Sequence, residues 1–179
     1  MEKGDVWISV VLYTAIMLAI ISTILIAVNP KIEEYRDRIV INGMIQVLNT
    51  LDSTIQEVND VIGNKRSFDI KISKGQLLIL PEDDIIIYSI NTNFEFSQPD
   101  QIINIDKVNL RTKKEMGKVM VELWLNYSDT TVNITTSQDE EGNILTITPA
   151  PKPYKIWIEN LGPPSSDSPN NTIYISITP

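Results

Sequence analysis

The sequence of 179 residues contains no cysteine and no histidine. Without cysteine there is no disulfide framework, no thiolate metal site and no thiol nucleophile. Without histidine the chain lacks the commonest metal ligand and the only side chain whose ordinary pKa lies near neutrality. These absences exclude most hydrolase and transition-metal chemistry, so we expect no enzyme, no catalytic residues, no metal and no cofactor.

Basic residues are outnumbered by acidic ones. The 15 lysine and arginine residues stand against 23 aspartate and glutamate residues, which gives a net charge of −8. Nucleic-acid binding needs a surplus of positive charge to neutralise phosphates, so we expect no nucleic-acid partner. The acidic clusters at residues 82–84 and 139–141 could ligate calcium, but both lack the alternating spacing of a calcium loop. Solvated turns are the favoured interpretation.

The longest apolar segment lies at the front of the chain, where residues 6–28 carry no charge. A helix of this length, at about 1.5 Å per residue, exceeds the hydrocarbon core of a bilayer, which is about 30 Å thick. We therefore expect a transmembrane helix over residues 5–29. The segment is too long for the apolar part of a secretory signal peptide and no good small-residue cleavage site follows it, so we expect the mature protein to retain it.

A second apolar pattern follows Pro30, with apolar residues at alternating intervals of three and four. The stripe consists of Ile41, Met44, Leu48, Leu51, Ile55, Val58 and Ile62. This spacing predicts a helix that packs along its length on a partner. We therefore expect Pro30 to kink one long helix, not to end it, and residues 30–64 to form an amphipathic extension. Docking on the chain's own sheet is the favoured interpretation of the stripe, and self-association is the weaker one.

Asn42-Gly43, flanked by apolar residues, is a rival signal. Asn-Gly is a strong hairpin cue, and glycine inside a helix costs about 1 kcal/mol relative to alanine. The helix is favoured because the 3.5-residue period continues through residues 41–62, whereas alternation with a period of two fails in residues 44–48. Gly63-Asn64 then predicts the C-terminal stop of the helix.

Residues 65–179 change to short β-branched and aromatic runs separated by turn residues, the pattern of β-strands. The predicted strands cover residues 67–73, 76–80, 85–90, 102–110, 118–127, 131–136, 143–148, 154–161 and 172–178. Many short strands of this kind predict a sandwich-like domain. The expected fold class is therefore α+β, with a long N-terminal transmembrane and amphipathic helix followed by an all-β antiparallel head domain.

Three Asn-x-Ser/Thr sequons lie in the β-rich part, at Asn126, Asn133 and Asn170. They are candidate N-glycosylation acceptors if this part lies outside the cytoplasm. Strand alternation places Asn133 on the face opposite Val132 and Ile134, where an enzyme could reach it. Chance would supply about as many sequons in a chain this rich in Asn, Ser and Thr, so both interpretations stay open.

Lys3-Gly4-Asp5, directly before the apolar segment, completes a pattern that resembles type IV pilins, in particular the archaeal pilin-like group with a class III signal peptide. The resemblance implies that a prepilin-type peptidase cuts after Gly4, so that residues 1–4 are a short leader. It covers residues 2–62, and beyond them only a β-rich head is similar. The glutamate common at the fifth mature position of bacterial pilins is Ser9 here, a departure that archaeal members often share.

The resemblance implies a structural subunit of a surface filament, either a pilin or a minor pilin-like protein of a type IV pilus. The apolar helices would leave the lipid and pack against one another in the filament core, with the heads outside. The packing face would include Trp7, Val10, Tyr13, Met17 and Ile21 together with the stripe. The implied partners are copies of the chain or related pilins, the peptidase, the pilus assembly platform and the membrane.

The sequence gives conflicting indications of how the chain is oriented in the membrane. Lys31, Arg36 and Arg38 follow the apolar segment, whereas only Lys3 precedes it, and by the positive-inside rule this favours a cytoplasmic C-terminus. The pilin-like front and the acidic, sequon-bearing β part favour a single-pass protein of the cell membrane with an extracytoplasmic C-terminal domain. The alternative function is a non-polymerising single-pass membrane protein whose extracytoplasmic β domain binds a ligand or surface partner.

Overall fold

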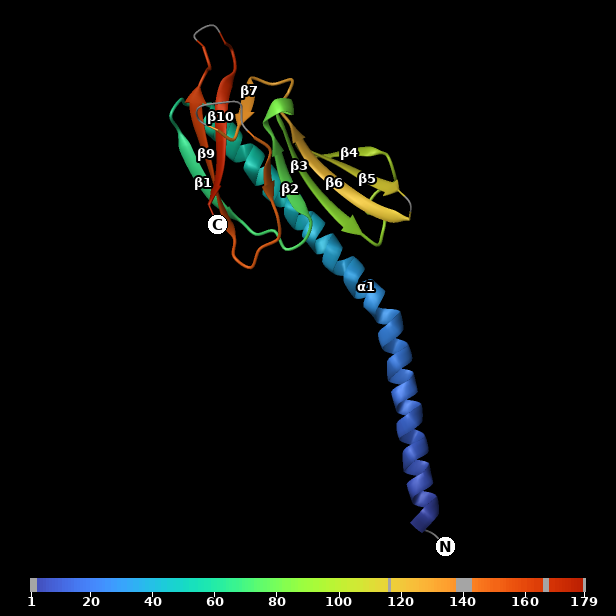
Figure 1. The fold of residues 1–179 in the computed structure, drawn as a ribbon. Helices are drawn as coiled ribbons and strands as arrows, with labels where there is room; N and C mark the ends of the chain where they lie inside the picture. The colour runs from blue at the N-terminus through green and yellow to red at the C-terminus, as the bar shows by residue number, and fades with distance from the viewer. Residues whose placement is uncertain (1–2, 116, 138–142, 166–167, 179) are drawn as a thin grey trace. The chain divides into compact units, whose positions relative to one another are not determined.

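The computed structural model describes residues 3–115, 117–137, 143–165 and 168–178, with side chains from Trp7 onward. Contacts divide the chain into two compact units, Met1–Asp37 and Arg38–Pro179. Helix α1 covers Lys3–Asn59 and contributes to both units (Figure 1). The predicted α+β layout, one long N-terminal helix followed by a mostly antiparallel β domain, is confirmed.

Helix α1 includes both residues that could have ended it, Pro30 and Gly43. The Asn42-Gly43 pair therefore lies in a helix and not in a hairpin. The continuing apolar stripe explains this result, because burying one face of a helix outweighs the modest cost of a single glycine. Pro30 removes one backbone donor from the helix, and the kink expected there stays a prediction.

The described part of the β domain contains ten strands in two sheets. Sheet A has the order β1-β9-β10-β7 and sheet B the order β4-β5-β6-β3-β2-β8. The strands are β1 Lys65–Ile70, β2 Gln76–Leu80, β3 Ile85–Thr92, β4 Ile102–Ile105, β5 Val108–Glu115, β6 Lys118–Asn126, β7 Val132–Thr135, β8 Leu145–Ile147, β9 Tyr154–Gly162 and β10 Asn171–Thr178.

One pair of strands departs from the antiparallel arrangement expected for the whole domain. Strand β10 runs parallel to β7, with Asn171 opposite Val132 and Tyr174 opposite Thr135. Parallel neighbours need a long crossover connection, and here β8 and β9 lie between the two strands in sequence. No local sequence signal marks such a pairing.

Residues 102–110, predicted as a single strand, form the hairpin of β4 and β5 instead. Ile105 pairs with Val108, so the chain reverses at Asp106 and Lys107. Asp106 has a φ of 54°, a left-handed conformation that aspartate tolerates better than most residues. The uninterrupted β-branched pattern concealed this turn.

A single hydrophobic core joins the C-terminal part of α1 to the inner faces of both sheets. Figure 1 shows this part of the helix running between the two sheets. Ile41, Leu48, Leu51, Ile55 and Val58 are fully buried in this core. The helix therefore forms the centre of the domain, and the domain is not a simple sandwich of one sheet on another.

The C-terminal end of α1 is held by asparagine side chains from the segments that follow it. The amide of Asn160 in β9 donates to the carbonyls of Val58 and Asn59, each at 3.1 Å. Asn64 donates to the carbonyl of Glu57 at 3.0 Å, and Asn171 also donates to Asn59. These amides satisfy carbonyls that have no partner within the helix. The helix end is thereby fixed to both inner strands of sheet A.

Candidate functional site

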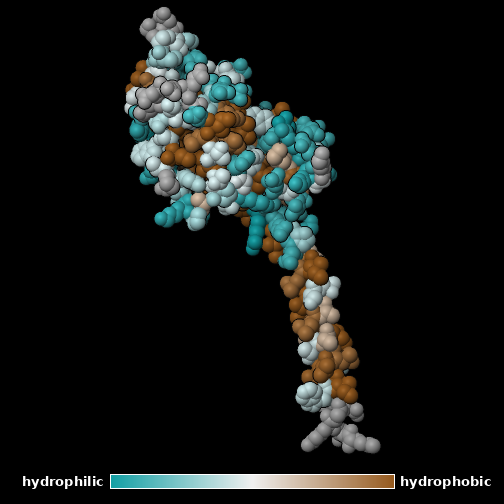
Figure 2. Space-filling view, in the orientation of Figure 1, coloured by the Kyte–Doolittle hydropathy of each residue, from teal (hydrophilic) through white to brown (hydrophobic). Residues whose placement is uncertain are grey.

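The N-terminal part of α1 presents an apolar surface that nothing in its own unit covers. Five predicted packing residues lie on it, and each is at least 51% exposed: Trp7, Val10, Tyr13, Met17 and Ile21. Figure 2 shows hydrophobic residues along this part of the helix. The described residues include one helix long and apolar enough to cross a membrane. An apolar surface of this size requires lipid or protein around it.

Three hydroxyl side chains within the apolar part of α1 form hydrogen bonds with the helix backbone. The hydroxyls of Thr14, Ser22 and Thr23 each donate to the carbonyl four residues earlier, at 2.8 Å. A hydroxyl without a partner would be costly in hydrocarbon, and these bonds remove that cost. These side chains are therefore compatible with a lipid environment.

The predicted processing site lies in the first turn of α1. Lys3, Gly4 and Asp5 have helical backbone, and their side chains lie outside the described part. The cleavage expected between Gly4 and Asp5 stays a prediction. Ser9 lies on the helix just beyond this site.

The apolar stripe beyond Pro30 is occupied within the chain's own β domain. The first six residues of the stripe, from Ile41 to Val58, are at most 4% exposed and belong to the hydrophobic core that α1 forms with the two sheets. They cannot contact another subunit while the domain is folded. Ile62 does not continue the stripe, because α1 ends at Asn59 and leaves Ile62 64% exposed in the turn that follows.

The first sequon lies at the end of β6, where Asn126 is exposed. Its carboxamide oxygen accepts hydrogen bonds from the backbone N–H of Ser128 at 3.0 Å and from the Ser128 hydroxyl at 2.8 Å. The middle residue of the sequon, Tyr127, is buried and donates to Asp52 at 2.8 Å. Burial and, after it, the charge of Asp52 raise the pKa of Tyr127, so the phenol stays protonated.

The other two sequons meet in space. Asn133 lies on β7, an outer strand of sheet A, and Asn170 directly precedes β10. The side-chain amide of Asn170 donates to the carboxamide oxygen of Asn133 at 3.3 Å. The parallel pairing of β7 and β10 causes this approach between residues far apart in sequence, so the sequence alone could not reveal it.

The acidic turn at residues 82–84 has a structural role. Asp84 follows the short helix η1 (Pro81–Asp83) with a left-handed φ of 54°. Its carboxylate accepts the backbone N–H of Ile134 in β7 at 2.6 Å, which links the two sheets. The described residues include no cluster of three potential metal ligands. The second acidic cluster, residues 139–141, lies outside the described part.

The environment of Asp84 determines how this link depends on pH. Burial has the largest effect and raises the pKa of Asp84 above its ordinary value of 3.8; the Ile134 hydrogen bond opposes it and the charge of Asp83 adds to it. The folded protein therefore binds this proton more tightly than the unfolded chain. The contribution of Asp84 to stability is fully present below pH 3.8 and is lost as the pH rises through the folded pKa.

Two substitutions of Asp84 should separate its hydrogen bond from its charge. Asp84→Asn keeps an oxygen acceptor for Ile134 and tolerates the left-handed backbone, so at pH 7 it should be more stable than wild type by a few tenths of a kcal/mol. This advantage should shrink below pH 3.8. Asp84→Ala leaves the buried N–H without an acceptor and should cost about 1–3 kcal/mol. Urea unfolding at both pH values measures these differences; equal losses in both variants would contradict the assignment.

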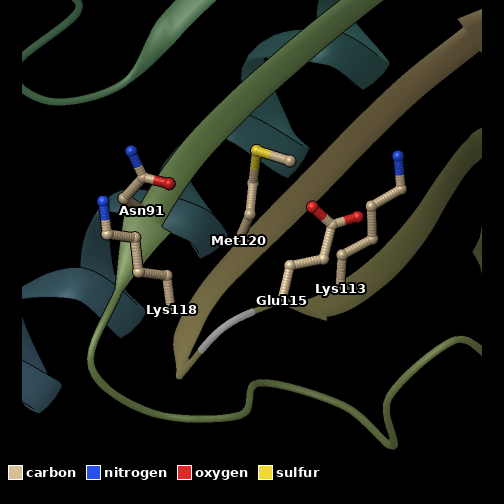
Figure 3. A pocket seen from close by; sticks show the side chains of 5 residues that line it. All are labelled: Asn91, Lys113, Glu115, Lys118 and Met120. Carbon is tan, nitrogen blue, oxygen red and sulfur yellow. The ribbon is translucent and has the colours of Figure 1, made fainter.

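A cavity of about 240 Å³ lies at the end of the β5–β6 hairpin. Figure 3 shows its lining of Asn91, Lys113, Glu115, Lys118 and Met120. The ammonium group of Lys113 is held by Glu122 at 2.9 Å. The five lining side chains include no hydroxyl or thiol nucleophile beside a base, so they do not indicate covalent catalysis.

Two features of the described residues point to a function. They are the exposed apolar surface of α1 and the sequon asparagines on the β domain. The chain as a whole matches no protein-family model, no curated protein and no solved structure.

Proposed function

We propose that the chain is a structural subunit of a surface filament, a pilin or minor pilin-like protein. Residues 5–29 would anchor it in the cell membrane before assembly. The observation that carries the proposal is the exposed apolar surface of α1, which is described from Trp7 onward, three residues after Gly4. Lipid chains would cover this surface in the membrane, and the same surface on other copies would cover it in the filament.

The burial pattern of the helix supports a division of roles along the chain. The Arg38–Pro179 unit keeps the stripe inside its own core, so this unit can stay folded in both environments. Subunit contacts through the helix would then come from the Met1–Asp37 unit, with Trp7 and Met17 among the contacting residues. This arrangement lets one surface change partners without unfolding the β domain.

The proposal implies a defined set of partners. A prepilin-type peptidase would remove residues 1–4, and a pilus assembly platform would extract the mature chain from the membrane. Copies of the chain or related pilins would then pack with it. The β domain would lie outside the cytoplasm throughout, first at the membrane and then on the surface of the filament.

The mass of the intact chain from native membranes and from sheared surface material tests the proposal. The mature chain should begin at Asp5, because cleavage after Gly4 precedes assembly. A Gly4→Val variant should keep its leader and remain in the membrane fraction, while Gly43→Val, the same change far from the processing site, should be cleaved normally.

The opposite result would favour the second candidate. Wild-type chains that begin at Met1 or Glu2, and are absent from sheared material, would contradict the filament proposal. They would fit a non-polymerising single-pass membrane protein whose extracytoplasmic β domain binds a ligand or surface partner. The basic residues Lys31, Arg36 and Arg38 after the apolar segment do not separate the two candidates, because both place the β domain outside the cytoplasm.

A further inference from the structure

We propose that Asn133 and Asn170 form a single glycan-acceptor site that carries one N-linked glycan per chain, and that Asn126 is a separate acceptor. The proposal rests on the proposed function in one respect, the extracytoplasmic position of the β domain. Read as sequence, the chain offers three independent acceptors. The structure reduces them to two places on the domain.

The geometry of the shared site comes from the β7–β10 pairing. Asn133 lies opposite Thr172, the hydroxyl-bearing residue of the Asn170 sequon. The Asn170 amide nitrogen lies 3.3 Å from the Asn133 carboxamide oxygen, and the Asn170 backbone N–H donates to Ser168 at 3.3 Å. Both asparagine side chains are partly buried. The two carboxamides therefore touch, and the Asn133 carboxamide fills space beside the nitrogen of Asn170.

The chemistry of the modification explains why one glycan would exclude a second. The side-chain nitrogen of asparagine attacks the anomeric carbon of a polyprenyl-phosphate-linked glycan. A carbon–nitrogen bond forms, the bond between the anomeric carbon and the phosphate oxygen breaks, the lipid phosphate leaves, and the nitrogen gives up one proton to solvent. A glycan on Asn133 leaves its oxygen free to accept from Asn170. If both asparagines carried a glycan, the two glycans would be attached to carboxamides that are in contact, and their bulk would force the two side chains apart.

Asn126 differs from this pair in place and in local structure. It lies at the end of β6 in sheet B, whereas the pair lies on sheet A. It is exposed, and its carboxamide oxygen accepts two hydrogen bonds from Ser128 of its own sequon. A glycan at the shared site would lie on β7, an outer strand of sheet A.

Glycan counting on the full-length chain tests the proposal. The chain is produced in a host with active extracytoplasmic N-glycosylation, and intact mass is combined with glycopeptide analysis. We expect wild-type chains with at most two glycans and never both Asn133 and Asn170 occupied. Asn133→Gln should raise the glycan occupancy of Asn170 until it equals the combined occupancy of Asn133 and Asn170 in the wild type. Asn126→Gln, the matched control, should remove one glycan and leave that combined occupancy unchanged.

A second variant guards against a folding defect in the asparagine substitutions. Thr172→Val destroys the Asn170 sequon but keeps the contact between the two asparagines, and it should move the shared glycan entirely to Asn133. Three glycans on one chain, unchanged occupancy of Asn170 in Asn133→Gln, or no glycan at either site would overturn the proposal. The same spectra report the N-terminal residue. In a host that also has a prepilin-type peptidase, a chain that starts at Met1 with shared occupancy would contradict only the filament function.

Discussion

Replacing Ile55 by alanine should lower the free energy of unfolding of the β domain by about 2–5 kcal/mol. Ile55 is fully buried where the helix meets both sheets, so its removal loses the transfer free energy of the side chain and leaves a cavity. Urea unfolding of the full-length protein in detergent micelles, followed by the fluorescence of Trp124 and Trp157, measures the loss.

Ile39→Ala is the matched control, because it makes the same change in the same helix at a residue that is 71% exposed. It should alter the free energy of unfolding by no more than about 0.5 kcal/mol. If Ile55→Ala unfolds at the same urea concentration as Ile39→Ala, the stripe is not part of the domain's core. A midpoint that rises with protein concentration in the wild type and not in Ile55→Ala would instead support self-association through the stripe.

Two arginines in the middle of the apolar segment should prevent stable insertion into the membrane. Each arginine at the centre of a transmembrane helix costs about 2.5–3.5 kcal/mol on insertion scales, so Leu18→Arg with Ile21→Arg should cost roughly 5–7 kcal/mol. Both residues lie on the exposed apolar surface of α1. Flotation of membranes on a density gradient should find most of the double variant in the soluble fraction.

Tyr35→Arg provides the control for added charge. Tyr35 is exposed on the same helix beyond the apolar segment, so an arginine there should leave the protein in the floating membrane fraction. If the double variant floats as well as Tyr35→Arg does, residues 6–28 do not anchor the chain. A double variant that stays in the membrane but loses filaments would assign the segment to assembly alone.

The features that the sequence predicted are those with a repeated local pattern. The 3.5-residue period identified the stripe from Ile41 to Val58 and correctly outweighed the Asn42-Gly43 signal. The charge-free run identified the apolar surface of α1. Each of these depends on many residues that agree, so one contrary glycine or proline did not change the result.

The features that the sequence missed depend on contacts between distant segments. The Asp106 turn was hidden because its flanking residues are as β-branched as a strand. The amide of Asn160 could not be predicted as a cap for α1, because only the folded sheet brings it to Val58. The contact between Asn133 and Asn170 has the same origin in the parallel β7–β10 pair. Local propensity carries no information on such partners.

The asparagine amides at the end of α1 also determine how the domain would bear mechanical load. A pull on the N-terminal end of the helix would be resisted along its axis by the buried stripe and by the amides of Asn64, Asn160 and Asn171 together. Asn160 and Asn171 belong to β9 and β10, the two inner strands of sheet A. Tension on the helix would therefore be shared between two hydrogen-bonded strands of sheet A and would not fall on a single segment.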